Sequence, residues 1–293
     1  MKVGSISRLW RFPVKSMAGE RLDESECTTH GLVGDRAYAL IDAKTGKVVS
    51  AKSVRLFPEL LNCRASFVEQ PRSDGEAPPV RIDLPDGASV RSDSSDADDL
   101  LTAFFGRAVK LARVAPENFT IDQYHPDVEN ADPAGRRDTV VEQKLGSAFF
   151  DEVGMPSPVP VGSFFDLFPL TVLTTSTLRW LSELQPGSAF DDRRFRMNVV
   201  VDTDEDGFVE NQWVGRELAL GDSTRLSVAL PDPRCVMTTL TQDDLPSDIE
   251  VLRTLVRHNR IQVGSVGRFP CAGTYAVVLE AGFIRVGDGV SLM

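Results

Sequence analysis

Short strand-like segments, separated by turns rich in glycine, proline and aspartate, run through most of this chain and limit its possible folds. They do not alternate with helices in a repeating βαβ pattern, and no segment repeats at a fixed period. We therefore predict an α+β fold that is mostly β, with a barrel-like sheet. The predicted strands cover residues 5–12, 37–41, 47–50, 61–68, 80–84, 88–91, 170–173, 197–201, 217–220, 225–230, 274–280, 282–286 and 290–293.

Turn residues join several of these strands into predicted hairpins. Residues 42–46, Pro85-Asp86-Gly87 and residues 221–224 are the three connecting turns. Each is short and lies between two apolar segments, so the strands on either side should pair with each other.

Helix signals are few. SDADDLLTAFFG offers Ser95 or Asp96 as an N-cap, acids in the first turn and a glycine, Gly106, after the end. Two further helices are predicted, one capped by Thr174 or Thr175 and ending near 184, the other capped by Ser247 or Asp248 and ending near 258. Residues 115–165 are rich in Pro, Asp and Gly, with few periodic segments, and we place the join between two domains within or just before them.

Length and charge restrict the class of protein. The 293 residues exceed what one hydrophobic core usually serves, so one large or two modest domains are expected. The formal net charge is −11, which argues against nucleic acid or an anionic membrane as a partner, since such partners need a basic surface. An anion site in this chain must therefore be a local pocket.

The chain has no apolar run near the roughly 18 residues of a membrane span and no signal-peptide core at its N-terminus. A cytoplasmic location is expected. The four cysteines, Cys27, Cys63, Cys235 and Cys271, are scattered without CxxC spacing, which favours reduced thiols over disulfides or zinc.

Common catalytic motifs are absent: there is no GxSxG, no GxxxxGK[ST] and no GxGxxG after a strand. Residues 263–268, with two glycines three apart, are a weak match to a phosphate loop. Several arginines and a lysine remain, next to turns and strand starts. Each alone is typical of a solvated strand end, but several arginines together can form a fork for phosphate or carboxylate oxygens.

Seven segments together are more specific than any of these motifs. LWRFPVKSMAGE, GLVGDRAYAL, RLFPEL, FDDRRFRMNVVV, WVGRELALGD, PDPRCVMTTL and FIRVGDGV resemble, in order and spacing, the MOSC (molybdenum cofactor sulfurase C-terminal) proteins that carry an N-terminal β-barrel domain. Mitochondrial amidoxime-reducing components and their bacterial relatives are the most similar kinds. The resemblance covers nearly the whole chain and is thin over 115–165. It implies a MOSC N-terminal β-barrel domain over 1–118 and a MOSC domain over 119–293.

The resemblance assigns Cys235 as a ligand of molybdenum, and hence as the catalytic residue. A thiolate is a soft anionic ligand, and Arg234 with nearby backbone N–H groups favours the thiolate form. The alternative is a buried structural cysteine, which is common for free thiols. The cofactor implied is molybdenum cofactor, Mo-molybdopterin.

The resemblance also assigns residues that hold this cofactor: Lys15, Ser16, Arg36, Arg196, Asn198, Arg234, Thr238 and Tyr275. Tyr275 could equally be a core aromatic, because its segment is an ordinary strand. This chain departs from the family in three places: Met197 replaces a proline between Arg196 and Asn198, Leu167-Phe168-Pro169 replaces a small hydroxyl residue after Asp166, and TLTQDDLPSD follows Cys235 in place of Val-Asp-Pro-x-Thr-Gly.

The activity implied is two-electron reduction of small N-hydroxylated substrates such as amidoximes and hydroxylamines. The chain has no cysteine run for an iron–sulfur cluster, so a separate electron donor of ferredoxin, flavoprotein or cytochrome type is implied. Two alternatives remain: a non-catalytic carrier of molybdenum cofactor, and a sulfur carrier that uses Cys235. The pyridoxal-phosphate domain of the sulfurases has no room in 293 residues already filled by two barrel-like domains.

Overall fold

Alternating buried and exposed side chains along the long strands produce a closed barrel in the computed structural model, which describes residues 1–293. In β15, every second residue from Thr224 to Val228 is buried. Seven strands pair in the cyclic order β12-β13-β1-β19-β14-β15-β17, and β17 returns to β12, so the sheet has no free edge there. Their bounds are β1 Lys2–Arg11, β12 Leu170–Thr174, β13 Val199–Asp202, β14 Glu217–Leu220, β15 Thr224–Pro233, β17 Gly267–Glu280 and β19 Gly289–Leu292.

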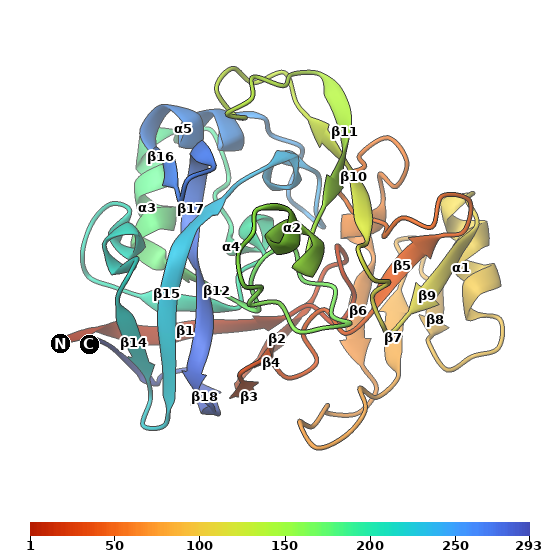
Figure 1. Cartoon of the computed structure of the whole chain (residues 1–293), viewed down its shortest axis with the longest axis horizontal. Helices are drawn as coiled ribbons and strands as arrows, with labels where there is room; N and C mark the ends of the chain where they lie inside the picture. Colours follow the sequence, from red (N-terminus) through yellow and green to blue (C-terminus); the bar gives the residue numbers. More distant parts are fainter.

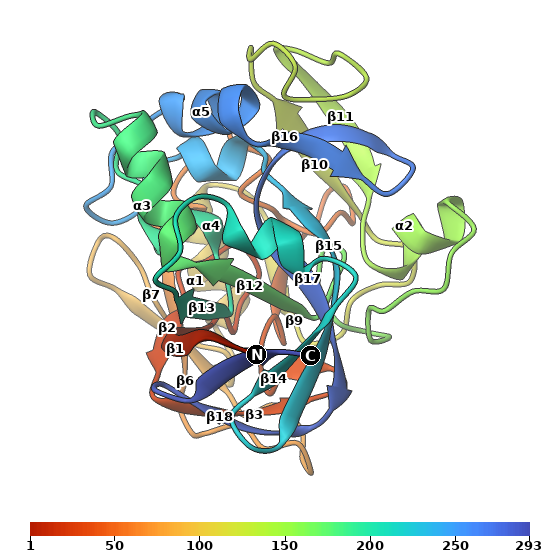
Figure 2. The same ribbon diagram turned by 90° about the vertical axis from the view of Figure 1, so that its left-hand side faces the viewer.

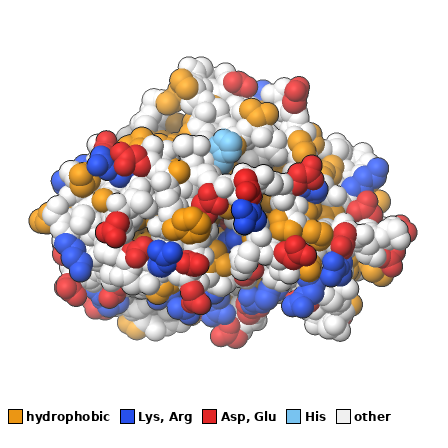
Figure 3. All heavy atoms as spheres, turned by 90° about the horizontal axis from the view of Figure 1, so that it is seen from below, with side chains coloured by type: hydrophobic (Ala, Val, Ile, Leu, Met, Phe, Trp, Pro, Cys, Tyr) orange, Lys and Arg blue, Asp and Glu red, His pale blue; other side chains and the backbone are white.

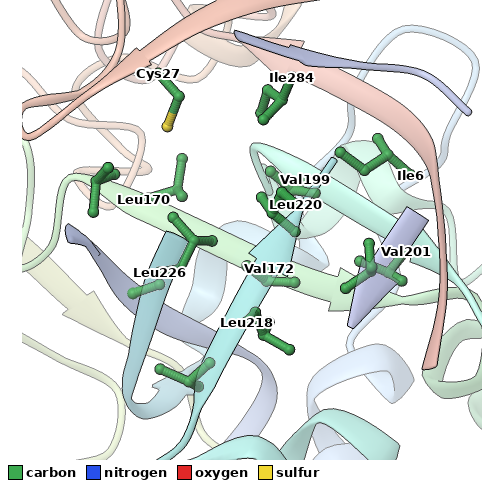
Figure 4. Packing of buried hydrophobic residues seen from close by; sticks show 14 of the residues in the cluster. Ile6, Cys27, Leu170, Val172, Val199, Val201, Leu218, Leu220, Leu226 and Ile284 are labelled. Atoms are coloured by element: carbon green, nitrogen blue, oxygen red, sulfur yellow. The ribbon is translucent and has the colours of Figure 1, made fainter. Parts of the chain in front are cut away.

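The barrel encloses the largest hydrophobic core of the molecule. Twenty buried residues form this core, which includes Val172 of β12, Val199 of β13 and Leu226 of β15. Figure 4 shows these side chains directed toward one another from strands around the barrel, with the sulfur of Cys27 among them. Burial of this apolar surface is the main force that closes the barrel.

A second unit packs beside the barrel, at the right of Figure 1. Its own core of 18 buried residues includes Val14, Leu40, Leu61, Ile82 and Leu101. The small sheets of this unit are β5-β9 and β6-β7-β8. The small sheet β18-β3-β4 packs on the barrel core instead, while β2 pairs β1 and β16 pairs β17. Their bounds are β2 Glu20–Leu22, β3 Glu24–Thr28, β4 Gly31–Leu32, β5 Ala39–Asp42, β6 Arg64–Phe67, β7 Val80–Asp83, β8 Ser89–Arg91, β9 Val109–Ala112, β16 Arg260–Val263 and β18 Gly282–Arg285.

Three of the five α-helices, α1, α3 and α5, form where the sequence predicts helices. Thr174 caps the helix α3 by accepting from the Thr177 N–H, and Gly106 ends α1 with a φ of 61°. Asp98 and Asp99 occupy the first turn of α1, where negative charge is favourable. The bounds are α1 Ala97–Phe105, α2 Ser147–Glu152, α3 Thr175–Leu184, α4 Asp192–Phe195 and α5 Glu250–His258, with short 3-10 helices η1 Leu60–Asn62, η2 Val209–Trp213 and η3 Val236–Thr239.

Two of the three predicted hairpins are confirmed, and the third forms only in part. β7 pairs β8 and β14 pairs β15 across their predicted turns. The segment after residue 46 turns back antiparallel to β5, but it makes only the isolated bridge Ile41↔Val48 and no full strand. The distant β9 forms the longer ladder on the other edge of β5.

The region 115–165 is more regular than its composition indicates. It contains the antiparallel hairpin of β10 Thr120–His125 and β11 Thr139–Lys144, followed by α2. Both strands carry polar residues on their exposed faces, which hides them from a search for apolar segments. Figure 2 shows this hairpin, β16 and α2 on the same side of the barrel.

The two ends of the chain meet in the barrel. β1 pairs β19, with Lys2 opposite Ser291 and Ser5 opposite Gly289, and Figure 1 shows the termini side by side. The first strand of the predicted N-terminal domain is therefore hydrogen-bonded into the barrel formed by the C-terminal half. The division at 118 stays a prediction.

Figure 3 shows one face of the molecule, on which acidic and basic side chains are interspersed, hydrophobic groups are scattered and no large patch of one sign is seen. None of the helices has both the length and the apolar character needed to cross a bilayer.

Candidate functional site

One cavity of about 120 Å³ between the barrel and the second unit is lined by all nine predicted site residues. They come from separate parts of the chain: the turn after β1, the turn before β5, the end of α4, the exit of β15, η3 and β17. The residues are Lys15, Ser16, Arg36, Arg196, Asn198, Arg234, Cys235, Thr238 and Tyr275. The structure therefore gathers side chains up to 260 positions apart, from Lys15 to Tyr275, around one space.

Cys235 differs from the other three cysteines. Cys27, Cys63 and Cys271 are buried, and burial raises the pKa of Cys27 and of Cys63 to about 12 and that of Cys271 higher still. Cys235 is half-buried and lines the cavity. It is thus the one thiol placed to react or to bind at this site.

The backbone around Cys235 is fixed by its neighbours. The guanidinium of Arg234 donates to the carbonyl oxygens of Ala272 and Phe195 at 2.7–2.9 Å and to the carboxylate of Asp232 at 2.5 Å. The hydroxyl of Thr238 donates to the Cys235 carbonyl oxygen at 3.1 Å. Arg234 and Thr238 therefore hold the loop that presents the thiol, and their donors are used within the protein.

Two lysines share one carboxylate at the same cavity. Lys15 binds one oxygen of Asp166, and Lys52 binds the other at 2.7 Å. Burial lowers the pKa of Lys15, although the charge of Asp166 opposes this effect. Burial also disfavours the charged form of Lys52, but the charges of Asp166 and Cys235 outweigh it, so the pKa of Lys52 is raised. The lysines hold the pKa of Asp166 well below its usual value against the effect of burial. This cluster carries a net positive charge.

Arg36 and Arg196 stack on one aromatic ring. Their guanidinium carbons lie 4.5 and 4.2 Å from the centre of the Phe12 ring. Arg196 donates through Nη1 to the Met17 carbonyl oxygen at 2.7 Å, but its buried Nη2 has no partner. Burial, with the nearby charge of Arg36, lowers the pKa of Arg196 to about 9. A buried cation with an unused donor is costly unless an anion binds it.

Backbone strain collects at this cavity. Ser16, Arg36 and Arg196 have φ values of 64°, 50° and 54°, in the left-handed region that side chains other than glycine, asparagine and aspartate seldom adopt. Strain of this kind costs about 1–3 kcal/mol per residue and is concentrated at binding and active sites.

Asn198 lines the cavity, and its side-chain amide is occupied by neighbouring protein groups. Its Nδ2 donates to Asp35 Oδ2 at 2.9 Å, and Asp35 also accepts from the Arg36 guanidinium. The Asn198 Oδ1 accepts from the backbone N–H and the hydroxyl of Thr171. The amide is therefore a positioning group that fixes Arg36 through Asp35.

The lining charges favour a bound anion. Six cationic side chains and two carboxylates line the cavity of a chain whose net charge is −11. Arg194, one of the six, donates to four backbone carbonyl oxygens and is structural. The remaining excess of cations, the unpartnered Nη2 of Arg196 and an accessible thiol fit a ligand that combines a phosphate with a soft metal.

Asp232 and Tyr275 both line the same cavity. Burial raises the pKa of Asp232 to about 6 despite Arg234. Burial likewise raises the pKa of Tyr275. The Tyr275 ring stacks on Phe168 with centroids 4.9 Å apart. Tyr275 is thus both packed and part of the cavity wall.

Asp232→Asn is expected to change how stability depends on pH. The Asp232 carboxyl stays protonated up to about pH 6 in the folded protein, whereas in the unfolded chain it loses its proton near pH 3.8. The protonated carboxyl therefore contributes fully to the free energy of unfolding below pH 3.8, and this contribution is lost as the pH rises through 6. Relative to the variant, the wild type should lose about 2–3 kcal/mol between pH 4 and 7.5. Urea unfolding of cofactor-free protein measures this, and parallel stability curves would contradict it.

Three charged residues that line the cavity were not predicted as site residues from the sequence: Lys52, Asp166 and Asp232. Asp232 lies three positions before Cys235, and this closeness in sequence to the predicted metal ligand was the one signal for it. Lys52 follows a loop that makes one isolated bridge, and no local signal distinguishes it from a solvated lysine.

Two domain models and several known proteins are similar to this chain. The model of the MOSC N-terminal beta barrel domain matches residues 3–111, and that of the MOSC domain matches residues 162–291. Human mitochondrial amidoxime-reducing component 1 is 24% identical over 304 residues, covering 100% of this chain and 84% of that protein. Human mitochondrial amidoxime reducing component 2 is 25% identical over 310 residues, with the same two coverages. The crystal structure of the YUAD protein from Bacillus subtilis aligns with a TM-score of 0.46 and 10% identity, covering 100% of this chain and 96% of that one.

The two matched ranges account for most of the chain, with six of the seven barrel strands in the second of them, and β1 and the small sheets β5-β9 and β6-β7-β8 in the first. The cavity lies where the two ranges meet and draws residues from both. The chain therefore belongs to the family of MOSC-domain proteins with a MOSC N-terminal β-barrel domain, a family associated with molybdenum cofactor.

Proposed function

We propose that this protein binds molybdenum cofactor, with Cys235 as the protein ligand of the metal, and reduces small N-hydroxylated compounds. The observation that carries the proposal is the placement of an accessible thiol and an excess of buried cations around one cavity. The names of the human relatives, amidoxime-reducing components, support the substrate class.

The residues present suit the phosphate of a pterin cofactor. Arg36 and Arg196 lie together over Phe12 and offer planar donors, while Lys15 and Lys52 add positive charge on the far side of Asp166. Ser16 adds a hydroxyl from a strained turn. Arg234, Thr238 and Asn198 act as positioning residues, since their hydrogen bonds fix the Cys235 loop and Arg36.

When bound, the cofactor supplies two-electron redox chemistry at the metal. The overall reaction breaks the N–O bond of the substrate: an amidoxime, two electrons and two protons give an amidine and water. The electrons come from a separate donor of ferredoxin, flavoprotein or cytochrome type. The protein binds the cofactor, orients the substrate beside it and shields the site from water.

Protein from a host that makes molybdenum cofactor should contain near-stoichiometric molybdenum and should reduce benzamidoxime with an artificial electron donor. Elemental analysis and product quantification by chromatography measure the two properties. Zinc or no metal would overturn the proposal. Full molybdenum loading with no turnover would instead identify a cofactor carrier.

A further inference from the structure

A second and larger cavity opens from the cofactor site. It has a volume of about 460 Å³ and shares Lys52, Asp166, Phe168, Cys235 and Tyr275 with the first cavity. We call it the apolar chamber. Its walls come from the β10–β11 hairpin, α2 and the β16–β17 hairpin, which Figure 2 shows on the same side of the barrel. A molecule in the apolar chamber would therefore lie next to the Cys235 thiol.

The walls of the apolar chamber are mostly hydrophobic and aromatic. Phe150 packs edge-on against Phe168 with centroids 5.8 Å apart, and Phe168 stacks on Tyr275. These rings form a continuous wall from α2 to the cofactor cavity. Met155 and Val266, whose side chains are about half exposed, lie on the rim of the apolar chamber. An apolar opening of this kind is typical of a small-molecule site.

Two residues that line the apolar chamber, His125 and Gln143, each carry a buried side-chain atom with no hydrogen-bond partner in the protein. The two atoms are His125 Nε2 and Gln143 Oε1, and His125 is only 7% exposed. The β10–β11 register pairs His125 with Thr139 and Gln143 with Ile121, so both residues lie on one face of the hairpin. Buried polar atoms are normally satisfied, so two left open at the wall of one cavity favour a polar ligand group there.

We infer that the apolar chamber binds the body of the substrate and selects ring-containing hydrophobic N-hydroxylated compounds that carry a second polar group, such as a hydroxyl. Of this inference, only the N-hydroxylated nature of the substrate rests on the proposed function. A hydroxyl suits either atom, because it can donate to Gln143 Oε1 or can donate to or accept from His125 Nε2. The volume falls in the ordinary range for small-molecule pockets.

Binding of unreactive probes to cofactor-free protein tests the chamber directly. We expect 4-phenylbenzamide to bind about 10- to 100-fold more tightly than benzamide, because the second ring is buried. A hydroxyl on that ring should add about fivefold. His125→Phe should remove this hydroxyl advantage and leave the affinity for 4-phenylbenzamide within about twofold. Calorimetry and ligand-observed NMR measure these affinities, and equal binding of small and bulky probes would overturn the inference.

Charges at the rim provide a second test. The double variant Met155→Glu, Val266→Glu should weaken binding of 4-phenylbenzamide about tenfold and raise the KM for its amidoxime with kcat little changed. A matched control is Val114→Glu, Val286→Glu, two exposed hydrophobic residues outside the apolar chamber. The control should behave as wild type, and equal effects of the two double variants would contradict the assignment.

The two proposals fail in different ways. Reduction of acetamidoxime and 4-phenylbenzamidoxime with the same kcat/KM would overturn the chamber inference and leave the proposed reductase function intact. Selective binding of bulky probes by a fully loaded protein that reduces nothing would overturn the proposed function and support the apolar chamber as a ligand pocket.

Discussion

Cys235→Ala should eliminate reduction of N-hydroxylated compounds and remove most of the molybdenum. Loss of a partner that only supports a metal ligand typically costs about 10- to 100-fold, so loss of the ligand itself should lower activity by more than about 100-fold. The cations around the phosphate position do not depend on the thiol, so pterin content should fall less than molybdenum content. Elemental analysis, fluorescence of the oxidised pterin and turnover of benzamidoxime give the three values.

Cys271→Ala is the matched control for this experiment. Cys271 is buried and lines neither cavity, so its removal should leave molybdenum content and activity near wild-type values. A Cys235→Ala protein that keeps full molybdenum and full activity would contradict the proposal that Cys235 is the metal ligand. Equal loss in both cysteine variants would point to a general folding defect instead.

Arg196→Met should separate cofactor binding from stability. The methionine keeps an unbranched apolar stem over Phe12 and removes a buried cation whose Nη2 has no partner. Loss of the hydrogen bond to the Met17 carbonyl costs about 1 kcal/mol, and loss of the buried charge offsets that cost. We expect cofactor-free stability within about 1 kcal/mol of wild type, and cofactor content at least tenfold lower.

Arg194→Met provides the contrast. Arg194 is also buried, but it donates to the carbonyl oxygens of Ala189, Thr238, Leu240 and Pro246. Its loss leaves buried acceptors unsatisfied and should cost at least about 3 kcal/mol in unfolding free energy. Urea unfolding of both cofactor-free variants measures the difference. Comparable destabilisation by the two substitutions would show that Arg196 is a structural residue and not part of an anion site.

Local signals in the sequence predicted local structure well. The helix that ends at Gly106 and the hairpin around Pro85-Asp86-Gly87 form as predicted, because their caps and turns are encoded within a few residues. The pairing of β5 with β9 was not predicted. It joins segments almost 70 positions apart, and no short-range pattern specifies which edge a strand will meet.

The candidate site shows the same limit. The motifs around Lys15, Arg36, Arg196 and Cys235 predicted residues that the fold brings to one cavity, although what they bind stays a proposal. Lys52 reaches the same place from a loop without any motif. The apolar chamber was not predicted either, since it is formed by side chains of three elements, each of which is unremarkable in sequence.

The pairing of β1 with β19 has a consequence for biosynthesis. The first residues of β1 must wait for β19, more than 280 positions later in the sequence, before this edge of the strand is covered. Partners so distant along the chain make closure slow, because the entropy of a very long loop is lost before the contacts form. Until then this part of β1 exposes unpaired amide and carbonyl groups, so folding during synthesis should benefit from a chaperone that shields the segment.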